Sequence, residues 1–498
     1  MATPAAAAKE FVSGPRVLQA ARLLLDSFSV RQICEALASA TSDDVEPLVL
    51  ALEGLTEFDE VRPMFLEADV NAFLQQGATA ADPRLRSMVA KLVCRLATHG
   101  EATLERLLEA NMLNLCEPLL LDEDTGVAEA AARAVCAAAK FPAGRQAVIG
   151  GGFAGSSLLE SFQSRLPELS DVQRIRVLAL FVELGRVADE AFAALESRKA
   201  LDQVLHSFLT DDLLLKLNAV ELMDALGSYE RGQDFLARAN VPDKLAKDLA
   251  DPYCDPSVRL CVTRLLGFIA GRSAASAKLL LSSHEAPFPQ SIAGMLDSRD
   301  VSERLCAINA WATASLQSEG LSFFLRWTPL LQEMVSLVSA TQNEVAKAAM
   351  DAWATILQDR PPVTDSIDEA QEGPREIWTI AEQQVTPSVL KNLSVKPFPD
   401  VRPHTWRVLS VLVRSRSAAQ QALDSQEVQE LLLNFQSETS TDARYAKHDL
   451  VKTLLQWHSN WLSGLLDSQV FELMSQFAEQ GPYWVPRAAG TAMRDEAA

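Results

Sequence analysis

One helical pattern of apolar residues recurs along the chain. In its clearest copy, an apolar stripe begins at Val258 and continues at Val262, Leu265, Leu266 and Ile269. Offsets of 0, +4, +7, +8 and +11 place five side chains on one side of an α-helix, within a sector about 80° wide. This copy therefore predicts an amphipathic helix that packs its stripe against other elements.

The same pattern can be traced along nearly the whole sequence. It starts at Leu85, Val127, near Ile175 (where the register is blurred by one residue), and at Leu215, Val258, Glu303, Val345, Val401 and Ala446; an earlier copy is expected near Val45. Most intervals fall in the range of about 40–47 residues that HEAT and armadillo repeats share. Strand-like alternation persists nowhere. We therefore predict an all-α fold, a right-handed α-solenoid (superhelix) of about ten armadillo- or HEAT-like repeats, each burying its apolar face against its neighbours.

A glycine-containing phrase recurs between these predicted helices. It begins at Gly100, Gly144 and Gly232, and small residues such as Asn111 and Asn240 follow some residues later. We interpret the phrase as a helix that ends at the glycine, a short helix after it, and a turn at the small residue into the next helix. The phrase is typical of the three-helix, armadillo-like repeat.

One interval between helices is longer than the others and contains an acidic, proline-broken stretch. We expect residues 359–376 to form an acidic loop on the solenoid edge. A partner-contacting role and a plain disordered insertion both stay open. For the rest, we expect a disordered N-terminus at 1–14, a continuous solenoid over 15–487 and a disordered tail at 488–498.

Charge and cysteine content narrow the range of possible partners and cellular compartments. The formal net charge of -21 disfavours general binding to nucleic acid, because phosphates would be repelled. The seven cysteines are odd in number and form no CxxC pair, which favours a reducing compartment. No apolar run is long enough for a membrane span, and the first residues lack the order of a signal peptide. We expect a cytoplasmic protein, with the nucleus as a second location.

One stretch imitates a cofactor site. Gly150, Gly152 and Gly155 match G-x-G-x-x-G, which in a dinucleotide-binding fold lets a helix N-terminus approach a pyrophosphate. That site requires a strand directly before the glycines, whereas a helical repeat follows here and other repeats turn at the same place. We favour the turn. The sequence also lacks HExxH, a phosphate-cradling loop and GxSxG, so we expect no catalytic, cofactor-binding or metal residues and no enzyme.

Two rows of polar residues recur on the repeated helices. One position after each pattern start stand Arg86, Arg176, Lys216, Arg259, Arg304, Arg402 and Lys447, and acids precede them at Asp82, Asp171, Asp212, Asp255, Asp300, Asp400 and Asp442. We expect these residues to pair between adjacent repeats and to cap helices.

The second row lies six positions after each start, about 220° from the centre of the stripe. Such side chains should be exposed. This row is our candidate partner-binding surface, with a merely solvated face as the alternative; its members are Lys91, Arg133, Glu221, Arg264, Asn309, Asp351, Arg407 and Lys452.

Several phrases in the sequence are more specific than generic repeats. They are Lys396–Asp400 followed by Trp406–Leu412, Asp442–Tyr445, Gly481–Pro486, and an earlier phrase, Tyr229–Leu236. Together they resemble the proteasome non-ATPase regulatory subunit 5 family. The first 80 or so residues match only as repeats, and the stretch 359–374 looks atypical for the family.

The resemblance implies a function that periodicity alone does not. Members of that family are assembly chaperones for the base of the proteasome regulatory particle. They hold the C-terminal domain of one AAA ATPase subunit and block premature docking on the core particle. The resemblance implies the same partner here, associated base subunits with it, and a monomer before binding; no catalytic residues carry over. The alternative is another armadillo or HEAT scaffold or a cytosolic transport adaptor.

Overall fold

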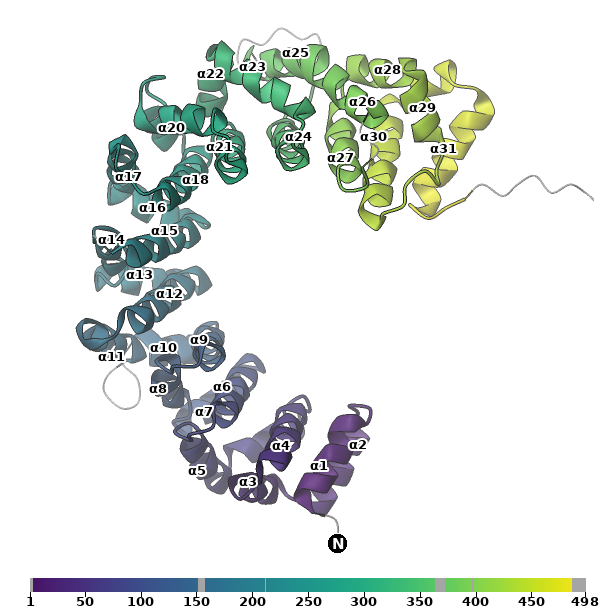
Figure 1. Ribbon diagram of the computed structural model, residues 1–498. Helices are drawn as coiled ribbons and strands as arrows, with labels where there is room; N and C mark the ends of the chain where they lie inside the picture. The colour runs from purple at the N-terminus through teal and green to yellow at the C-terminus, as the bar shows by residue number, and fades with distance from the viewer. Residues whose placement is uncertain (1–2, 151–156, 211, 363–371, 396–397, 486–498) are drawn as a thin grey trace, which may run out of the picture. The chain divides into compact units, whose positions relative to one another are not determined.

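A computed structural model describes residues 3–150, 157–210, 212–362, 372–395 and 398–485 of the chain, and the regular elements in these ranges are all helical. The chain divides into two compact units, Met1–Gly232 and Gln233–Ala498. Stacked helices in each unit confirm the prediction of an all-α solenoid (Figure 1). The right-handed, uninterrupted course over 15–487 stays a prediction.

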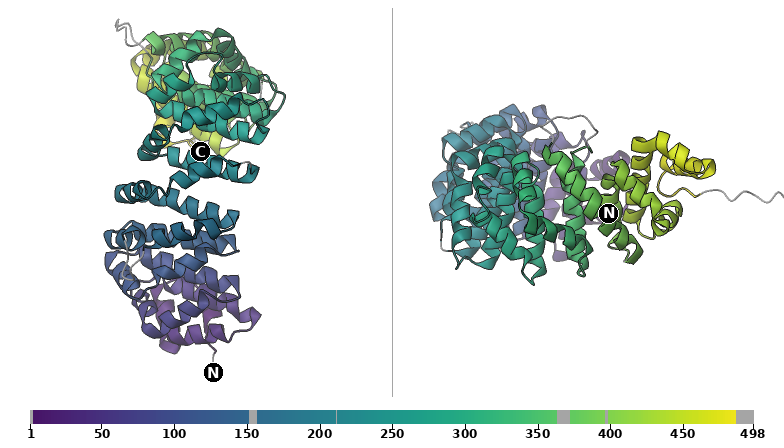
Figure 2. Two further views of the ribbon diagram at one scale, coloured as in Figure 1. Left: turned by 90° about the vertical axis from the view of Figure 1, so that its left-hand side faces the viewer. Right: turned by 90° about the horizontal axis from the view of Figure 1, so that it is seen from above.

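Unit 1 (Met1–Gly232) has two layers of helices. Successive helices of one layer pack side by side: α1 (Pro4–Ser13), α4 (Ser42–Leu55), α6 (Pro83–Thr98), α9 (Thr125–Ala139), α12 (Asp171–Val187) and α15 (Leu213–Gly227). The other layer consists of mostly shorter helices: α2 (Leu18–Ser27), α3 (Val30–Ala38), η1 (Arg62–Leu66), α5 (Ala68–Gly77), α7 (Glu101–Glu109), η2 (Leu113–Leu115), α8 (Cys116–Leu120), α10 (Pro142–Ile149), α11 (Leu158–Arg165), η3 (Leu166–Glu168), α13 (Asp189–Ser197) and α14 (Asp202–Phe208). Figure 2 shows the helices of this unit, coloured purple to blue, from two further directions. Helix α16 (Glu230–Arg238) contains the boundary.

Unit 2 (Gln233–Ala498) repeats this arrangement. Its first layer contains α18 (Pro256–Arg272), α21 (Val301–Ala314), α24 (Asn343–Gln358), α27 (Arg402–Leu412) and α30 (Thr441–Leu465). Its second layer contains α17 (Val241–Ala250), α19 (Ala274–Leu280), α20 (Pro287–Leu296), α22 (Ser318–Arg326), α23 (Thr328–Ser336), η4 (Leu337–Ser339), α25 (Glu372–Ile380), the π-helical turn η6 (Ala381–Val385), α26 (Thr386–Val395), α28 (Arg416–Asp424) and α29 (Gln426–Leu433). The last helix, α31 (Ser468–Gln480), packs on α30.

The predicted apolar stripes form the core between the layers. In α24, Val345, Ala349, Trp353 and Ile356 are completely buried. The final copy differs, because Trp457 of α30 is 43% exposed. Helix α30 kinks at His458, whose φ of -133° and ψ of 18° are not helical. The stripe prediction therefore fails at its last position, where the kink redirects the helix.

The sequence predicts that each recurring glycine ends a helix, but only one of the three lies between two helices. Gly100 does lie between α6 and α7, with φ of 150°. By contrast, Gly144 and Gly232 are each the third residue of a short helix, α10 and α16. A Cβ atom at either position would lie within 2.0 Å of a carbonyl oxygen at the end of the preceding long helix. These two glycines therefore permit the close approach of consecutive helices.

The predicted turns at small residues are confirmed where asparagine occurs. Asn111 and Asn240 adopt φ of 56° and 55°, in the left-handed region. Both stand where a short helix turns toward the next one. A third residue, Lys199, adopts the same conformation with φ of 55°, between α13 and α14. Sequence reasoning missed this turn because lysine is not a usual left-handed residue.

The expected disordered segments need correction at two places. Residues 4–13, predicted to be disordered, form α1, in which Ala8 and Phe11 are buried and which packs on α4. The end of the predicted acidic loop, residues 372–376, belongs to α25, because Ile377 and Trp378 on the same helix are buried in the core. Residues 363–371 and 488–498 lie outside the described residues.

Buried or half-buried thiols are found in both units. Burial raises the pKa of Cys34, Cys116 and Cys136 in unit 1 to about 12, and that of Cys306 in unit 2 to about 11. Thiols of this kind act as small apolar side chains. In the described part of the chain, no helix has the length and apolar character that crossing a bilayer requires.

Candidate partner-binding surface

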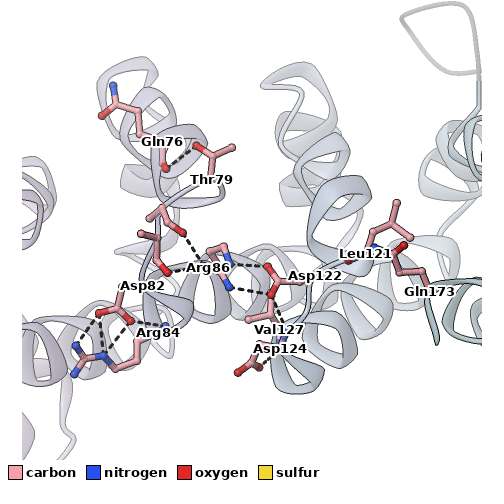
Figure 3. Close-up of polar contacts among 12 residues, drawn as sticks. Gln76, Thr79, Asp82, Arg84, Arg86, Leu121, Asp122, Asp124, Val127 and Gln173 are labelled. Carbon is pink, nitrogen blue, oxygen red and sulfur yellow. Dashed lines mark hydrogen bonds and ion pairs between the residues drawn. The ribbon is translucent and has the colours of Figure 1, made fainter. Parts of the chain in front are cut away.

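The row of cations at the start of the long helices connects adjacent repeats. Arg86 of α6 binds Asp122, which precedes α9, through two hydrogen bonds, Nε–Oδ2 at 2.5 Å and Nη2–Oδ1 at 3.0 Å (Figure 3). In unit 2, Arg402 binds Glu438 at 3.0 Å, and both side chains are largely buried. Arg304 donates to Gln342 at 3.2 Å. Three of the seven cations thus contact a polar side chain of the next repeat and have a structural role, but in none of the three is the partner one of the predicted acids.

The carboxylate of Asp122 is held ionised by this contact. Burial alone would raise its pKa, but hydrogen bonds from Arg86 and from the Asp124 amide outweigh burial and lower the pKa of Asp122 below its ordinary value. The Asp122 backbone carbonyl also accepts a hydrogen bond from Arg176 of α12. One short loop thus connects α6, α9 and α12.

The acids that precede the cations cap helices in four of the seven cases. Asp82, Asp212, Asp255 and Asp300 each accept a hydrogen bond from a backbone amide in the first turn of α6, α15, α18 and α21. The other three do not: Asp171 and Asp442 follow serine caps, and Asp400 pairs with Lys347 at 3.4 Å. Capping of this kind satisfies amides that have no partner within the helix.

The second row, at six residues after each start, lies mostly in solvent as predicted. Arg133, Glu221, Arg264, Asn309, Arg407 and Lys452 are exposed, whereas Lys91 and Asp351 are partly buried. Those two contact a neighbouring repeat: Lys91 Nζ lies 3.0 Å from Glu53 Oε1, and Asp351 lies 2.8 Å from His404 Nδ1. The contribution of all eight residues to partner binding stays a prediction.

Two grooves open between long helices beside this row. In unit 2 a groove of about 690 Å³ spans α24, α27 and α30, and its lining includes Asp351, Arg407, Ser410 and Asp449. In unit 1 a groove of about 510 Å³ lies between α9 and α12, and its lining includes Arg133. Sequence reasoning found one or two residues of each groove but neither groove itself. For the unit 1 groove, the available signal was the run of alanines in α9, whose small side chains leave the space unfilled.

The described residues contain no group of His, Cys, Asp and Glu side chains suited to a metal ion. Helix α10, not a strand, precedes the glycine motif and ends at Ile149, with Gly150 as its C-cap. This contradicts the dinucleotide alternative, which requires a strand there; Gly152 and Gly155 lie outside the described residues.

Comparison with known proteins gives consistent matches along the chain. A family model described as "Proteasome non-ATPase 26S subunit" matches residues 25–497. The protein "26S proteasome non-ATPase regulatory subunit 5" of Bos taurus is 20% identical over 437 residues, which are 87% of this chain and 84% of that protein. Its counterpart in Mus musculus is 21% identical over 438 residues, with the same coverage of both chains.

Proposed function

This chain belongs to the proteasome non-ATPase 26S subunit family, and from that membership we propose that it is a non-catalytic chaperone for assembly of the regulatory-particle base. In this proposal the solenoid binds the C-terminal domain of one base ATPase subunit. The bound chain covers that domain and blocks premature docking on the core particle. The family match over residues 25–497 is the observation that carries the proposal, because it spans both helical units.

The architecture supports a binding role. Stacked repeats present their long helices side by side, so that a row of exposed side chains extends over many repeats. In unit 2 this row includes Arg264, Asn309, Arg407 and Lys452. Residues of both signs favour a partner with a specific charge pattern over one with a uniform field. We place the ATPase contact on this row, next to the groove of α24, α27 and α30.

Co-purification tests the proposal directly. The tagged chain, expressed in its own cells, should recover base ATPase subunits without core-particle peptidase activity. Recombinant C-terminal domains of the base ATPases should then bind the purified chain one to one. Recovery of mature proteasome alone, or of a transport cargo or small GTPase in place of ATPases, would contradict the assembly role.

Charge reversal on the row tests the contact surface. Arg407→Glu combined with Lys452→Glu should weaken binding of the ATPase domain at least tenfold, because both side chains are exposed on the proposed face. Lys278→Glu combined with Arg326→Glu is the control with the same change in net charge. Both side chains are exposed, on α19 and α22 of the other layer. Equal weakening by the control would show that net charge, and not this surface, governs binding.

A further inference from the structure

The second half of α30, in unit 2, has an exposed surface without charged side chains. Residues 453–466 contain no Asp, Glu, Lys or Arg, although positions 456, 457, 459, 460 and 463–465 are exposed. Solvent-facing helix surfaces usually have charged side chains among the others. Here Trp457 is 43% exposed, Leu465 is 47% exposed, and Trp461 is half-buried. These three residues form the tryptophan patch.

The kink in α30 holds Trp457 in solvent. Of the eight tryptophans, all of which lie in the described ranges, only Trp457 is exposed. It occupies the last position of the apolar stripe, where Ile356 and Leu412 of the preceding repeats are completely buried. His458 Nε2 donates to the Val413 carbonyl at 2.8 Å and so anchors the kink to the end of α27. The fold therefore exposes a residue that the repeat pattern would bury.

One cation borders the patch. The guanidinium carbon of Arg416, the first residue of α28, lies 5.2 Å from the centre of the Trp461 ring. This side chain is exposed and has no ion-pair or hydrogen-bond partner in the part of the chain that the structure describes. A guanidinium stacked on an aromatic ring keeps its N–H groups available at its edge, where a carboxylate can accept them. The patch thus combines apolar surface with unused cationic donors.

Gly464 leaves the backbone of α30 bare beside Leu465. A Cβ atom at Gly464 would meet nothing within 4 Å, so no contact within the described residues requires glycine there. Nor does Gly464 adopt a positive φ, as Gly100 and Gly481 do. Glycine weakens a helix relative to alanine, and its benefit is that another backbone can approach closely. This position therefore indicates contact with a second chain.

We propose that the tryptophan patch binds a segment of a partner protein in which apolar side chains stand beside a carboxylate. The apolar side chains would pack on Trp457, Trp461 and Leu465, and the carboxylate would accept hydrogen bonds from Arg416. Tryptophan and arginine are the residues that most often dominate the energy of protein interfaces, and an exposed apolar patch of this kind marks an interaction site.

The identity of the partner as a base ATPase domain rests on the proposed function, whereas the chemistry of the patch does not. Lys452 of the exposed row lies on α30 as well, one residue before the uncharged stretch begins. A domain that contacts the row can therefore reach the patch. In this arrangement the row supplies charge contacts and the patch supplies the apolar anchor.

Two matched glycine substitutions test the patch against the proposed partner. Gly464→Glu places a bulky anion on the patch without disturbing the core, and should weaken binding of the recombinant ATPase domain about tenfold or more. Gly294→Glu adds the same charge at an exposed position of α20 where a Cβ atom also meets nothing within 4 Å, and should bind as the wild type does. Far-ultraviolet circular dichroism checks that both variants keep their helices. Equal binding by Gly464→Glu and the wild type would overturn the proposal.

Two further substitutions separate the apolar anchor from the cation. Trp457→Ala and Arg416→Gln should each weaken binding of the ATPase domain about fivefold or more. Tyr253→Ala is the control, because it removes an aromatic ring that is 93% exposed on the loop before α18. Unchanged binding by Trp457→Ala would overturn the apolar anchor, and unchanged binding by Arg416→Gln would overturn the carboxylate.

Anilinonaphthalene sulfonate, an apolar aromatic anion, tests the chemistry of the patch without any ATPase domain. Fluorescence titration should show equal dye binding by the wild type and Gly294→Glu, and a loss in Gly464→Glu. A wild-type chain that binds the dye in this manner but binds no base ATPase domain would contradict the assembly role and leave the patch supported. A chain that binds an ATPase domain equally well with Gly464→Glu, and shows no loss of dye, would do the reverse.

Sedimentation velocity tests the other occupant, a second copy of this chain. The wild type should sediment as a monomer under the conditions of the binding experiments. A dimer that Gly464→Glu dissociates, and Gly294→Glu does not, would show that self-association covers the patch and would overturn the proposed partner.

Discussion

Arg86 and Lys447 occupy the same position in their repeats but meet different surroundings. Arg86 finds a carboxylate on the next repeat, Asp122. Lys447 is 1% exposed and donates from Nζ to the carbonyls of Leu431 and Asn434 and to Ser437. Burial lowers the pKa of Lys447 to about 8. One row in the sequence thus contains both a paired cation and a desolvated one.

We expect Asp122→Asn to destabilise unit 1 by about 2–3 kcal/mol, because Arg86 would remain in a largely buried place without its charged partner. Thermal unfolding followed by circular dichroism measures the effect. The control is Glu60→Gln, since Glu60 pairs with Arg22 where both side chains are more than half exposed. Loss of that pair should leave the unfolding temperature nearly unchanged, because solvent screens an exposed ion pair. Equal effects of both substitutions would contradict the structural role of Arg86.

The lowered pKa of Lys447 predicts that the free energy of unfolding changes with pH in the opposite direction to that expected for a lysine in a stabilising ion pair. Between about pH 8 and pH 10.5 the unfolded chain retains a proton that the folded chain has released. The free energy of unfolding of the wild type should therefore rise with pH across this window, relative to that of Lys447→Met. Urea unfolding of both proteins at pH 7.5 and pH 10 measures the difference. Parallel pH profiles would show that Lys447 is not desolvated as described.

At the scale of elements, the long helices could be predicted from sequence more fully than the connections between them. Stripes such as that of α24 follow from the helical period alone. Gly144 and Gly232 were assigned to helix ends because glycine often stands there, whereas their role is to permit contact between two helices. Such a contact depends on atoms distant in space, and no local pattern contains it. Lys199 is missed for a related reason, since the fold holds it in a conformation that lysine itself disfavours.

In unit 2, Gly320 of α22 permits the same close approach of consecutive helices as Gly144 and Gly232. A Cβ atom there would lie 1.9 Å from the Ala314 carbonyl oxygen at the end of α21. Gly320→Ala should therefore destabilise the protein by about 3 kcal/mol or more, because α21 and α22 would have to separate. Thermal unfolding measures the change.

The matched control is Gly294→Ala in α20, where a Cβ atom would meet nothing within 4 Å. Alanine favours a helix over glycine, so this variant should gain up to about 1 kcal/mol. A gain in stability for Gly320→Ala as well would show that the close approach is absent.

At the scale of the whole molecule, the two units and their repeats explain which parts of the site were predictable. Exposure of Arg407 and Arg133 follows from their angle to the stripe, so the row was predicted correctly as a surface. The grooves beside it depend on how far apart neighbouring helices lie. That spacing is set by contacts such as Gln173 with Leu121, which join residues far apart in the sequence. Periodicity within one helix contains no information about it.

The exposed row predicts a salt-dependent association. If an acidic face of the ATPase domain meets Arg407 and Lys452, attraction between the two faces should raise the association rate, and salt should screen it. Stopped-flow measurements should show a fall of about tenfold between 50 and 300 mM salt, with a smaller change in the dissociation rate. An association rate that does not change with salt would indicate that charge does not guide the encounter.

The buried cysteines have a practical consequence. Cys34 and Cys116 are buried, and their raised pKa values leave almost no thiolate at neutral pH, so an alkylating reagent such as iodoacetamide can modify these two only when unit 1 opens locally. Mass spectrometry can identify each modified peptide over time. These two thiols therefore report local opening of unit 1, before and after a partner is added.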